Sequence, residues 1–541
     1  MITVTLYAVP APGQCIKGES KFLGTVRTNM HKAPLTALAA GLEQCLDREG
    51  VKTSVSIVDM QTTKSGMTKY GELDLDGLML EKYRVGMPFE GANDSLDASD
   101  IVGINSNFTH SRRIASDFAL HAKSRNPRAI VVVGGTEATA DPVYYLKNGA
   151  DVVVKGEGEL CFPWLIKSIA YGEGLESVPN ISYVSGGQIH HNLDTFLNRS
   201  SSLNVDAMPP PNLDLVDLTR YDDTGEGSPP YGLSGPFISV ETSRGCAQSC
   251  SFCATPFAKG RYRFMSLRTI GEHFKYFQSK GVGTLLFQED NVLSRVHHRN
   301  DGAPLFAEGR QELLDMFALA RDMGFSWEFT NGLELGRYES NGRIDRELID
   351  TMFWHGFDGG TLRGCYRATL PLENLTDESS RLFRKLKPLG IMKEIIKAIV
   401  ETGVHSLSFN LIIGRPEDSE RELLLSYERC LAIRELCMRT NSNVRVYFNI
   451  YVLSLLPGTV DYRKYKDLLA YDLEKDPEVI TFYLGSLRTK YFSPLEITQA
   501  RGTMAKLLNS DALIQDYDEN YYITCDRFER LFATADVDNL S

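Results

Sequence analysis

The 541-residue chain has no long apolar run, no excess of positive charge and no dense set of cysteines. No stretch reaches the roughly 18 apolar residues of a membrane-spanning helix, and the first residues lack the basic flank and apolar core of a secretion signal. With 58 basic against 70 acidic residues the formal charge is −12, so no overall positive field holds nucleic-acid phosphates. We therefore expect a cytoplasmic protein that binds neither membranes nor, in general, nucleic acids.

Three of the ten cysteines lie within eight positions, and this crowding favours metal ligation in a reducing compartment. Cys246, Cys250 and Cys253 follow the spacing CxxxCxxC. A structural zinc ion needs four close ligands, but residues 237–270 contain no other cysteine and no histidine. The next cysteine is Cys365, so an iron-sulfur cube at this segment keeps one iron without a cysteine ligand and open to a substrate.

Apolar strands alternate with helical periodicity over the first part of the chain. Strands are predicted at residues 2–9, 53–58, 100–104, 129–133 and 151–154, with helices at 35–49, 112–124 and 141–149. The third and fourth strands are continuously apolar, which is typical of parallel strands covered by helices on both faces. We expect a doubly wound, Rossmann-like α/β domain over residues 1–199, interrupted by a polar stretch between the second and third strands.

Ligands of doubly wound sheets bind beyond the carboxyl ends of the strands. The candidate binding residues at those ends are Ser106, Asn107, Gly134, Gly135, Thr136, Gly156 and Glu157. Glycines directly after a buried strand let a ligand approach the backbone closely, although a tight turn without a ligand is the alternative. This edge is therefore the predicted ligand edge of the first domain.

A second alternating series begins after a proline-rich segment. Its six strands are predicted at residues 237–242, 283–288, 326–330, 368–372, 404–413 and 444–452. Six β/α units fit a partial (β/α)6 barrel of the TIM type over residues 237–465 better than a closed eightfold one. Residues 200–236 are expected to form a linker or strap, and residues 466–541 a small, mainly helical cap.

The cysteine segment, with an aromatic residue before its third cysteine and directly after the first strand of a partial barrel, resembles the radical S-adenosylmethionine (SAM) superfamily. The resemblance implies that Cys246, Cys250 and Cys253 hold a 4Fe-4S cluster whose open iron chelates SAM. Electron transfer from a donor such as flavodoxin or ferredoxin then releases a 5'-deoxyadenosyl radical. Four residues match segments that approach SAM in this superfamily, and ordinary polar strand ends are the alternative: Gln288, Asp290, Glu373 and Ile412.

The amino-terminal sheet resembles the cobalamin-binding domains that precede some radical SAM barrels. Its pieces occur in the order of that class: Ala33-Pro34-Leu35, then residues 100–104, Gly134-Gly135 and residues 155–159. The resemblance implies bound cobalamin. No histidine lies between Val58 and Asp100, so the DxHxxG motif that supplies an axial imidazole is missing and cobalt is expected without a protein histidine. A degenerate sheet that binds nothing is the alternative.

These features favour a cobalamin-dependent radical SAM methyltransferase. By analogy with the fused class, it would methylate an unactivated carbon, or phosphorus, of a small-molecule or natural-product intermediate through methylcobalamin and the 5'-deoxyadenosyl radical. A radical enzyme that catalyses a non-methylating oxidation, cyclisation or rearrangement is one alternative, and a non-catalytic cobalamin or cluster sensor is another. No catalytic residue is identified, but Arg244 beside the cysteines is a candidate either to contact a carboxylate or to tune the cluster. We expect the ligand edges of both domains to face one cavity, closed by the strap.

Overall fold

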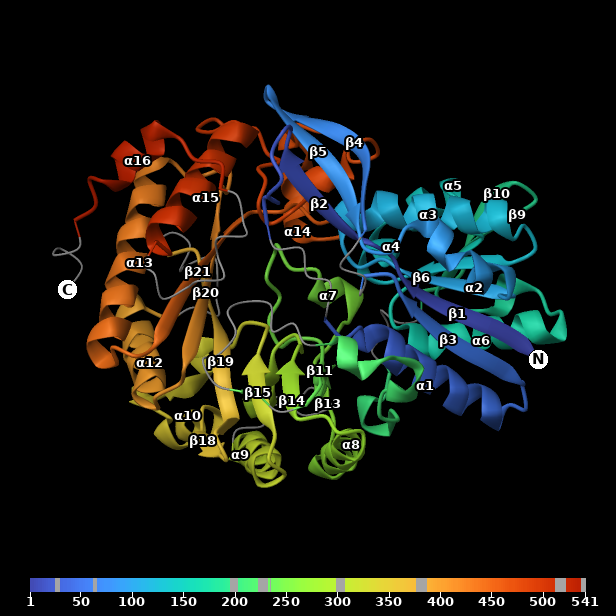
Figure 1. The fold of residues 1–541 in the computed structure, drawn as a ribbon, viewed down its shortest axis with the longest axis horizontal. Coiled ribbons are helices and arrows are strands. Elements are labelled where there is room, and N and C mark those ends of the chain that lie inside the picture. The colour runs from blue at the N-terminus through green and yellow to red at the C-terminus, as the bar shows by residue number, and fades with distance from the viewer. Residues whose placement is uncertain are drawn as a thin grey trace.

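The computed structural model describes residues 1–24, 30–61, 66–194, 203–221, 232–233, 235–297, 307–375, 387–510 and 522–536. Two α/β units lie side by side: residues 2–191 form one sheet with its helices, and the barrel and the carboxyl-terminal helices form the other (Figure 1). No helix among these residues is long and apolar enough to cross a membrane.

The first unit is built on a seven-stranded sheet in the order β10-β9-β8-β7-β6-β1-β3. Its strands are β1 (Ile2–Ala8), β3 (Thr53–Asp59), β6 (Ile101–Asn105), β7 (Ile130–Gly134), β8 (Val152–Val154), β9 (Ile181–Ser185) and β10 (Gln188–His191). Five neighbouring strands of this sheet are parallel: β3, β1, β6, β7 and β8. Strands β9 and β10 add an antiparallel edge that was not predicted from the sequence. Separate apolar cores cover the two faces of the sheet. The predicted doubly wound domain is confirmed.

Three helices cover this sheet: α1 (Ala33–Arg48), α3 (Arg112–Arg125) and α6 (Gly158–Tyr171). The short helices α2 (Asn93–Asp97), α4 (Thr136–Ala140) and α5 (Pro142–Lys147) fill the remaining connections. Leu35, Ala39 and Leu42 recur at helical spacing on α1 and are buried against the strands. The predicted helix at residues 141–149 is shorter in the structure because Pro142 starts it and Asn148 ends it.

A small antiparallel sheet stands apart from the doubly wound one and was not predicted. It pairs β2 (Ala11–Ile16) with β5 (Leu78–Val85), which also pairs with β4 (Met67–Leu75). Leu73, Leu75 and Leu80 from this sheet share an apolar core with residues 473–484 of the carboxyl-terminal segment. The segment read as a polar stretch is therefore partly a structural bridge to the far end of the chain.

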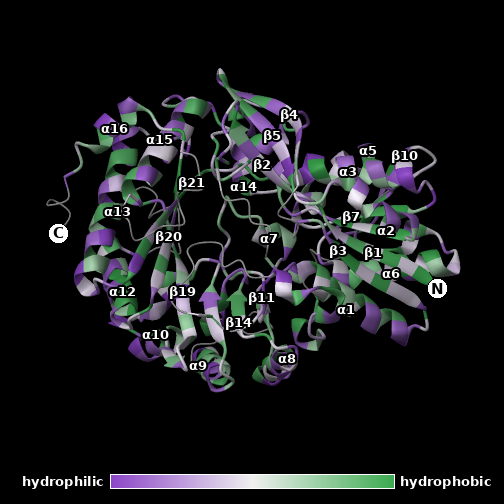
Figure 2. Ribbon diagram, viewed as in Figure 1, coloured by the Kyte–Doolittle hydropathy of each residue, from purple (hydrophilic) through white to green (hydrophobic). Residues whose placement is uncertain are grey.

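The second unit is an open, six-stranded parallel barrel, as predicted. Its strands run in the order β11 (Phe237–Val240), β14 (Thr284–Phe287), β15 (Ser326–Phe329), β19 (Thr361–Glu373), β20 (Ser406–Ile413) and β21 (Arg445–Val452). The helices α8 (Leu267–Ser279), α9 (Ala307–Asp322), α10 (Arg346–Met352), α12 (Leu389–Glu401) and α13 (Glu420–Thr440) surround it. Strand β19 starts earlier than predicted because its first residues form a hairpin with β18 (His355–Asp358). In Figure 2, β14 is green, which is the colour of hydrophobic residues. All four of its residues are buried.

The strap and the carboxyl-terminal region connect closely to the barrel. Within residues 203–221, Leu203, Val205 and Leu213 are buried in the barrel core, and Tyr221 Oη donates to Asp59 Oδ2 of the first unit at 3.2 Å. Helix α15 (Pro494–Leu508) packs beside β21, and Ile497, Ala500 and Met504 belong to the same core, as does part of α16 (Asp526–Phe532). Residues 195–202, 222–231, 234, 511–521 and 537–541 of the expected domain, strap and cap lie outside the described residues.

Candidate functional site

The three clustered cysteines lie on the loop of a small hairpin. Strands β12 (Ser243–Arg244) and β13 (Arg263–Phe264) pair, and the loop that joins them also holds the short helix α7 (Thr255–Ala258). Gly245 begins the loop with φ +80°, and a Cβ atom there would lie 2.5 Å from the Arg261 carbonyl oxygen. Glycine is therefore required where the chain leaves the hairpin.

The cysteine sulfurs have the surroundings of a metal cluster. The side chains of Cys246, Cys250 and Cys253 are half-buried and line a cavity of about 80 Å³. Cys246 Sγ accepts hydrogen bonds from Gln248 N at 3.4 Å and from Asn291 Nδ2 at 3.6 Å. Such hydrogen bonds stabilise negative charge on a ligating sulfur. The donor set therefore fits a cluster bound by thiolates.

The arrangement differs from a site for one metal ion. Among the described residues, no group of three or more histidine, cysteine, aspartate or glutamate side chains is arranged to hold a metal ion. A single zinc ion with Zn–S bonds of about 2.3 Å draws its sulfurs to within about 4 Å of one another. In an iron-sulfur cube each thiolate binds a different iron, so wider separation of the sulfurs is expected.

A carboxylate beneath the cysteine loop was missed by the sequence analysis. Glu334 follows β15 and is buried, and its oxygens accept from Gln248 Nε2 and from Asn291 Nδ2, both at 2.8 Å. Glu289 is another buried carboxylate, and it accepts from Thr242 N at 3.1 Å. Both follow a barrel strand, so the rule that sites lie at carboxyl strand ends could have indicated them.

The predicted SAM-contacting residues fall into two groups. Gln288 and Asp290 line the cavity described next, and Asp290 also lines the cysteine cavity. Asp290 accepts from Gly245 N at 2.9 Å, so it anchors the cysteine loop. Glu373 and Ile412 line neither of these two cavities. Glu373 is buried at a β-bulge with φ +57°, a strained conformation that is common at functional sites.

A larger cavity of about 580 Å³ lies between the two units. On the side of the first unit it is lined by most of the predicted ligand edge: Asn107, Gly134, Gly135, Thr136, Gly156 and Glu157. On the barrel side it is lined by Glu241, Arg244, Thr255, Phe257, Lys259, Gln288, Asp290, Asn331 and Leu456. The two carboxyl-terminal edges thus face one another, as predicted. The described part of the strap does not line the cavity, contrary to the expectation that the strap closes it.

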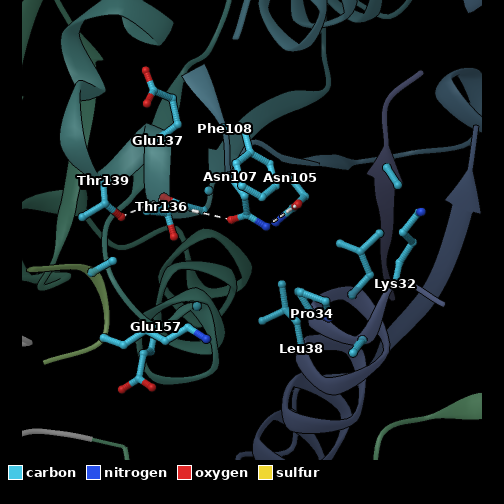
Figure 3. Close-up of a pocket in the computed structure, with 18 of the residues that line it drawn as sticks. Lys32, Pro34, Leu38, Asn105, Asn107, Phe108, Thr136, Glu137, Thr139 and Glu157 are labelled. Atoms are coloured by element: carbon cyan, nitrogen blue, oxygen red, sulfur yellow. Dashed lines mark hydrogen bonds between the residues drawn. The ribbon is translucent and has the colours of Figure 1, made fainter. Parts of the chain in front are cut away.

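Two loops of the first unit interlock at this edge. Asn107 Oδ1 accepts from Thr136 N at 3.1 Å, and Asn107 Nδ2 donates to Asn105 Oδ1 at 3.0 Å (Figure 3). Gly135 has φ +115°, and a Cβ atom there would lie 2.4 Å from the Ser106 carbonyl oxygen. Gly135 is thus needed for the loops to meet. Ser106 itself is buried outside the cavity lining, where its hydroxyl pairs with Tyr145 Oη at 2.7 Å.

Charged side chains dominate the barrel side. Burial opposes ionisation of Glu241, but ion pairs with Lys259 and Arg244 outweigh it and hold its pKa at about 2. Lys259 also pairs with Asp290 at 3.2 Å. Arg244 contacts carboxylates, as the sequence analysis expected, including Glu241 at 2.9 Å. The Glu157 carboxylate is also engaged by arginine, and in Figure 3 it is directed away from Asn107 and Thr136.

One histidine is among the residues that line the larger cavity. His31 is buried, its Nε2 lies 3.0 Å from Thr36 Oγ1, and burial lowers its pKa to about 3. His110, close to the Ser106–Asn107 loop, lies outside the lining, where its ring stacks on that of Phe108 at a centroid distance of 5.4 Å.

Protein-family models match both units of the chain. The B12 binding domain model matches residues 92–166, and the Radical SAM superfamily model matches residues 240–430. The chain is a radical SAM protein with a B12-binding domain. The first match contains the interlocked loops, and the second begins at β11 and contains the cysteine loop.

Curated relatives of this radical SAM protein carry methyltransferase names. "Uncharacterized methyltransferase PH0819" of Pyrococcus horikoshii is 24% identical over 332 residues, covering 60% of this chain and 62% of the relative. "Hopanoid C-3 methylase" of Methylococcus capsulatus is 27% identical over 375 residues, covering 66% of this chain and 59% of the relative. The chain thus matches about three fifths of the length of these relatives.

Two solved structures share the fold over most of this chain. The methyltransferase TsrM from Kitasatospora setae, with tryptophan and a SAM analogue bound, aligns with a TM-score of 0.58 at 14% identity, covering 85% of this chain and 74% of TsrM. The cobalamin-dependent SAM radical enzyme OxsB with aqua-cobalamin bound aligns with a TM-score of 0.59 at 15% identity, covering 94% of this chain and 66% of OxsB. At these identities the likeness concerns the fold.

Proposed function

We propose that this radical SAM protein is a cobalamin-dependent methyltransferase that acts on an unactivated carbon, or on phosphorus, of a small-molecule or natural-product intermediate. The cavity of about 580 Å³ carries the proposal, because the ligand edge of the B12-binding domain and the carboxyl-terminal edge of the barrel both line it. A methyl donor and a substrate radical must reach the same atom, and one shared cavity allows this. The methyltransferase names of the curated relatives favour the same reaction.

Each edge has a distinct part in this proposal. When bound, the cluster and SAM supply a 5'-deoxyadenosyl radical, and cobalamin supplies the methyl group. Cys246, Cys250 and Cys253 hold the cluster, and Asp290 fixes their loop through Gly245 N. Gln288, Asp290, Glu373 and Ile412 are proposed to contact SAM. An external one-electron donor such as flavodoxin or ferredoxin supplies the reducing electron.

The B12-binding domain is proposed to hold cobalamin through backbone and small side chains, without an axial histidine. The proposed contacts are Asn107, Gly134, Gly135, Thr136, the Gly156–Glu157 turn and the adjoining Ser106. The DxHxxG motif that would supply an axial imidazole is missing, and in His31, a histidine that lines the cavity, the Nε2 atom lies beside the Thr36 hydroxyl. The cobalt is therefore expected to lack nitrogen ligation from the protein.

Anaerobic reconstitution with iron, sulfide and cobalamin tests the proposal. The loaded protein is expected to show the absorbance of both cluster and corrin, and to form 5'-deoxyadenosine from SAM and a reductant. With SAM labelled as CD3 on its methyl group, a panel of small-molecule extracts is searched for products that gain a CD3 group. Labelled products support methyl transfer. SAM cleavage with only unmethylated products indicates the non-methylating radical enzyme, and a fully loaded protein that never cleaves SAM indicates a sensor.

A further inference from the structure

Two buried arginines face each other on the hairpin that carries the cysteine loop. Arg244 on β12 and Arg263 on β13 are paired in register, and they are 7% and 5% exposed. The loop between them contains all three clustered cysteines. Whatever holds these two side chains therefore holds both ends of the cluster-bearing loop.

Both arginines are held by carboxylates of the B12-binding domain. Arg263 Nη1 lies 2.7 Å from Glu157 Oε2, and Arg244 Nη1 lies 3.5 Å from Glu157 Oε1. Arg244 Nη2 lies 2.7 Å from Glu159 Oε1. The two glutamate side chains are no more than 10% exposed. A rigid guanidinium fork bound by two or three oxygens fixes orientation as well as distance.

The same glutamates are tied to the ligand edge of the B12-binding domain. Gly156 N donates to Thr139 Oγ1 at 2.8 Å, and Thr139 Oγ1 donates to the Gly135 carbonyl oxygen at 2.8 Å. Glu157 follows Gly156 directly. Two hydrogen bonds, the peptide bond between Gly156 and Glu157 and the ion pairs of Glu157 thus connect the Gly135 loop to the cysteine hairpin. Because these charges are buried, neutralising the glutamates leaves Arg263 without its carboxylate partner and Arg244 with Glu241 in place of three carboxylates.

We infer that Glu157 and Glu159 are positioning residues that clamp the cluster-bearing hairpin to the corrin edge. Their carboxylates fix the separation and orientation of the two reactive centres through the hairpin that they hold. This inference rests on the proposed function, in which both cofactors serve one substrate. The clamp gives the Glu157 side chain a role toward the barrel in addition to the cofactor contact proposed for its turn.

Hydrogen exchange on the full-length protein without added cofactors tests the clamp directly. In the double variant Glu157→Gln and Glu159→Gln, amides of residues 245–264 are expected to exchange about tenfold faster than in the wild type. Glu49→Gln is the matched control, because Glu49 pairs with Lys167 on the surface of the same domain, and it should leave this segment unchanged. Equal exchange in the double variant and the wild type overturns the inference. If the double variant does not fold, Glu159→Gln alone is expected to give a smaller increase in the same segment.

Pulsed electron spin resonance on the loaded protein measures the distance between the two cofactors. This distance would not change if Glu157 and Glu159 only stabilised the fold. The distance distribution between cob(II)alamin and the one-electron-reduced cluster is expected to be narrow in the wild type and at least twofold broader in the double variant, measured on the molecules that have bound both cofactors. An unchanged distribution overturns the inference. A wild-type protein that binds neither cofactor refutes the proposed function, whereas the exchange experiment still decides on the clamp.

Discussion

The two edges that line the shared cavity differ in the types of residue that form them. On the B12-binding edge, glycines, Asn107 and Thr136 line the cavity, neutral hydrogen bonds join the loops, and the carboxylate of Glu157 is paired with arginines of the barrel. The barrel edge carries buried and half-buried charges, such as Arg244, Glu241 and Lys259, in a connected network. A flat corrin needs backbone and space, whereas a loop of thiolates needs fixed counter-charges. Added volume should therefore damage the first edge, and lost charge should damage the second.

The largest effect is expected at the cysteines. Replacing Cys246, Cys250 and Cys253 together by Ala should remove cluster iron and all reductive cleavage of SAM. The protein should still fold, because the three side chains are half-buried on a loop and lie outside the apolar cores. Iron analysis and 5'-deoxyadenosine assays measure the loss, and circular dichroism checks the fold. Wild-type iron content in the triple variant would contradict the assignment.

The next largest effect is expected when a larger side chain is placed on the B12-binding edge. A Cβ atom at Gly134 meets nothing closer than Val154 O at 3.7 Å, so Gly134→Leu should fold and extend into the cavity. An intruding side chain costs about 1–3 kcal/mol, so we expect cobalamin to bind about 10- to 100-fold more weakly. Equilibrium titration with cobalamin measures this, and undiminished affinity would place the corrin elsewhere.

Gly135→Ala tests whether the backbone requires glycine at position 135, in contrast to the adjacent Gly134. Its Cβ atom would collide with the Ser106 carbonyl oxygen in a left-handed backbone conformation, so the expected cost is about 1–3 kcal/mol of folding stability. Denaturant unfolding measures this cost. A Gly135→Ala variant as stable as the wild type would show that the interlocked loops can separate at no cost.

Removing a charge from the barrel edge should change how the free energy of unfolding depends on pH. The pKa of Glu241 is held at about 2, below its ordinary value of 4.5, so its ionised form stabilises the folded state. At pH 7 Glu241→Gln should therefore lower the free energy of unfolding by up to about 3 kcal/mol. The difference from the wild type should be constant above about pH 4.5 and shrink as the pH falls toward 2. Denaturant unfolding at several pH values tests this, and a pH-independent difference would assign the loss to packing.

The smallest expected effect is at His31. Cob(II)alamin bound to the protein should show no hyperfine splitting from a protein nitrogen, and His31→Gln should leave the spectrum unchanged. Splitting that disappears in this variant would make His31 an axial ligand, and the B12-binding edge would then contain a strong donor after all.

Sequence patterns predicted those parts of the molecule that depend on neighbours in the chain. Continuous apolar runs located β6, β7 and the barrel strands, and the carboxyl-end rule placed Asn107 and Gln288 on one cavity. The pattern failed for β4 (Met67–Leu75), whose first three residues are exposed and whose buried leucines pack against a remote segment. It also gave no sign that Glu157 pairs with Arg263, because ion pairs between residues 106 positions apart leave no local periodicity.

The small sheet of β2, β4 and β5 also has a consequence for biosynthesis. Its Lys82 reaches Glu478, which is fully buried, at 3.2 Å across 396 positions, and Gln14 donates to the Glu478 carbonyl oxygen across 464 positions. A ribosome must therefore release nearly the whole chain before these strands can acquire their native neighbours. The doubly wound sheet has its own core and can form early. The apolar side chains of the small sheet stay exposed until residues 473–484 are available to pack against them. Ribosome-bound chains that end before residue 478 should accordingly need chaperone protection at residues 67–85.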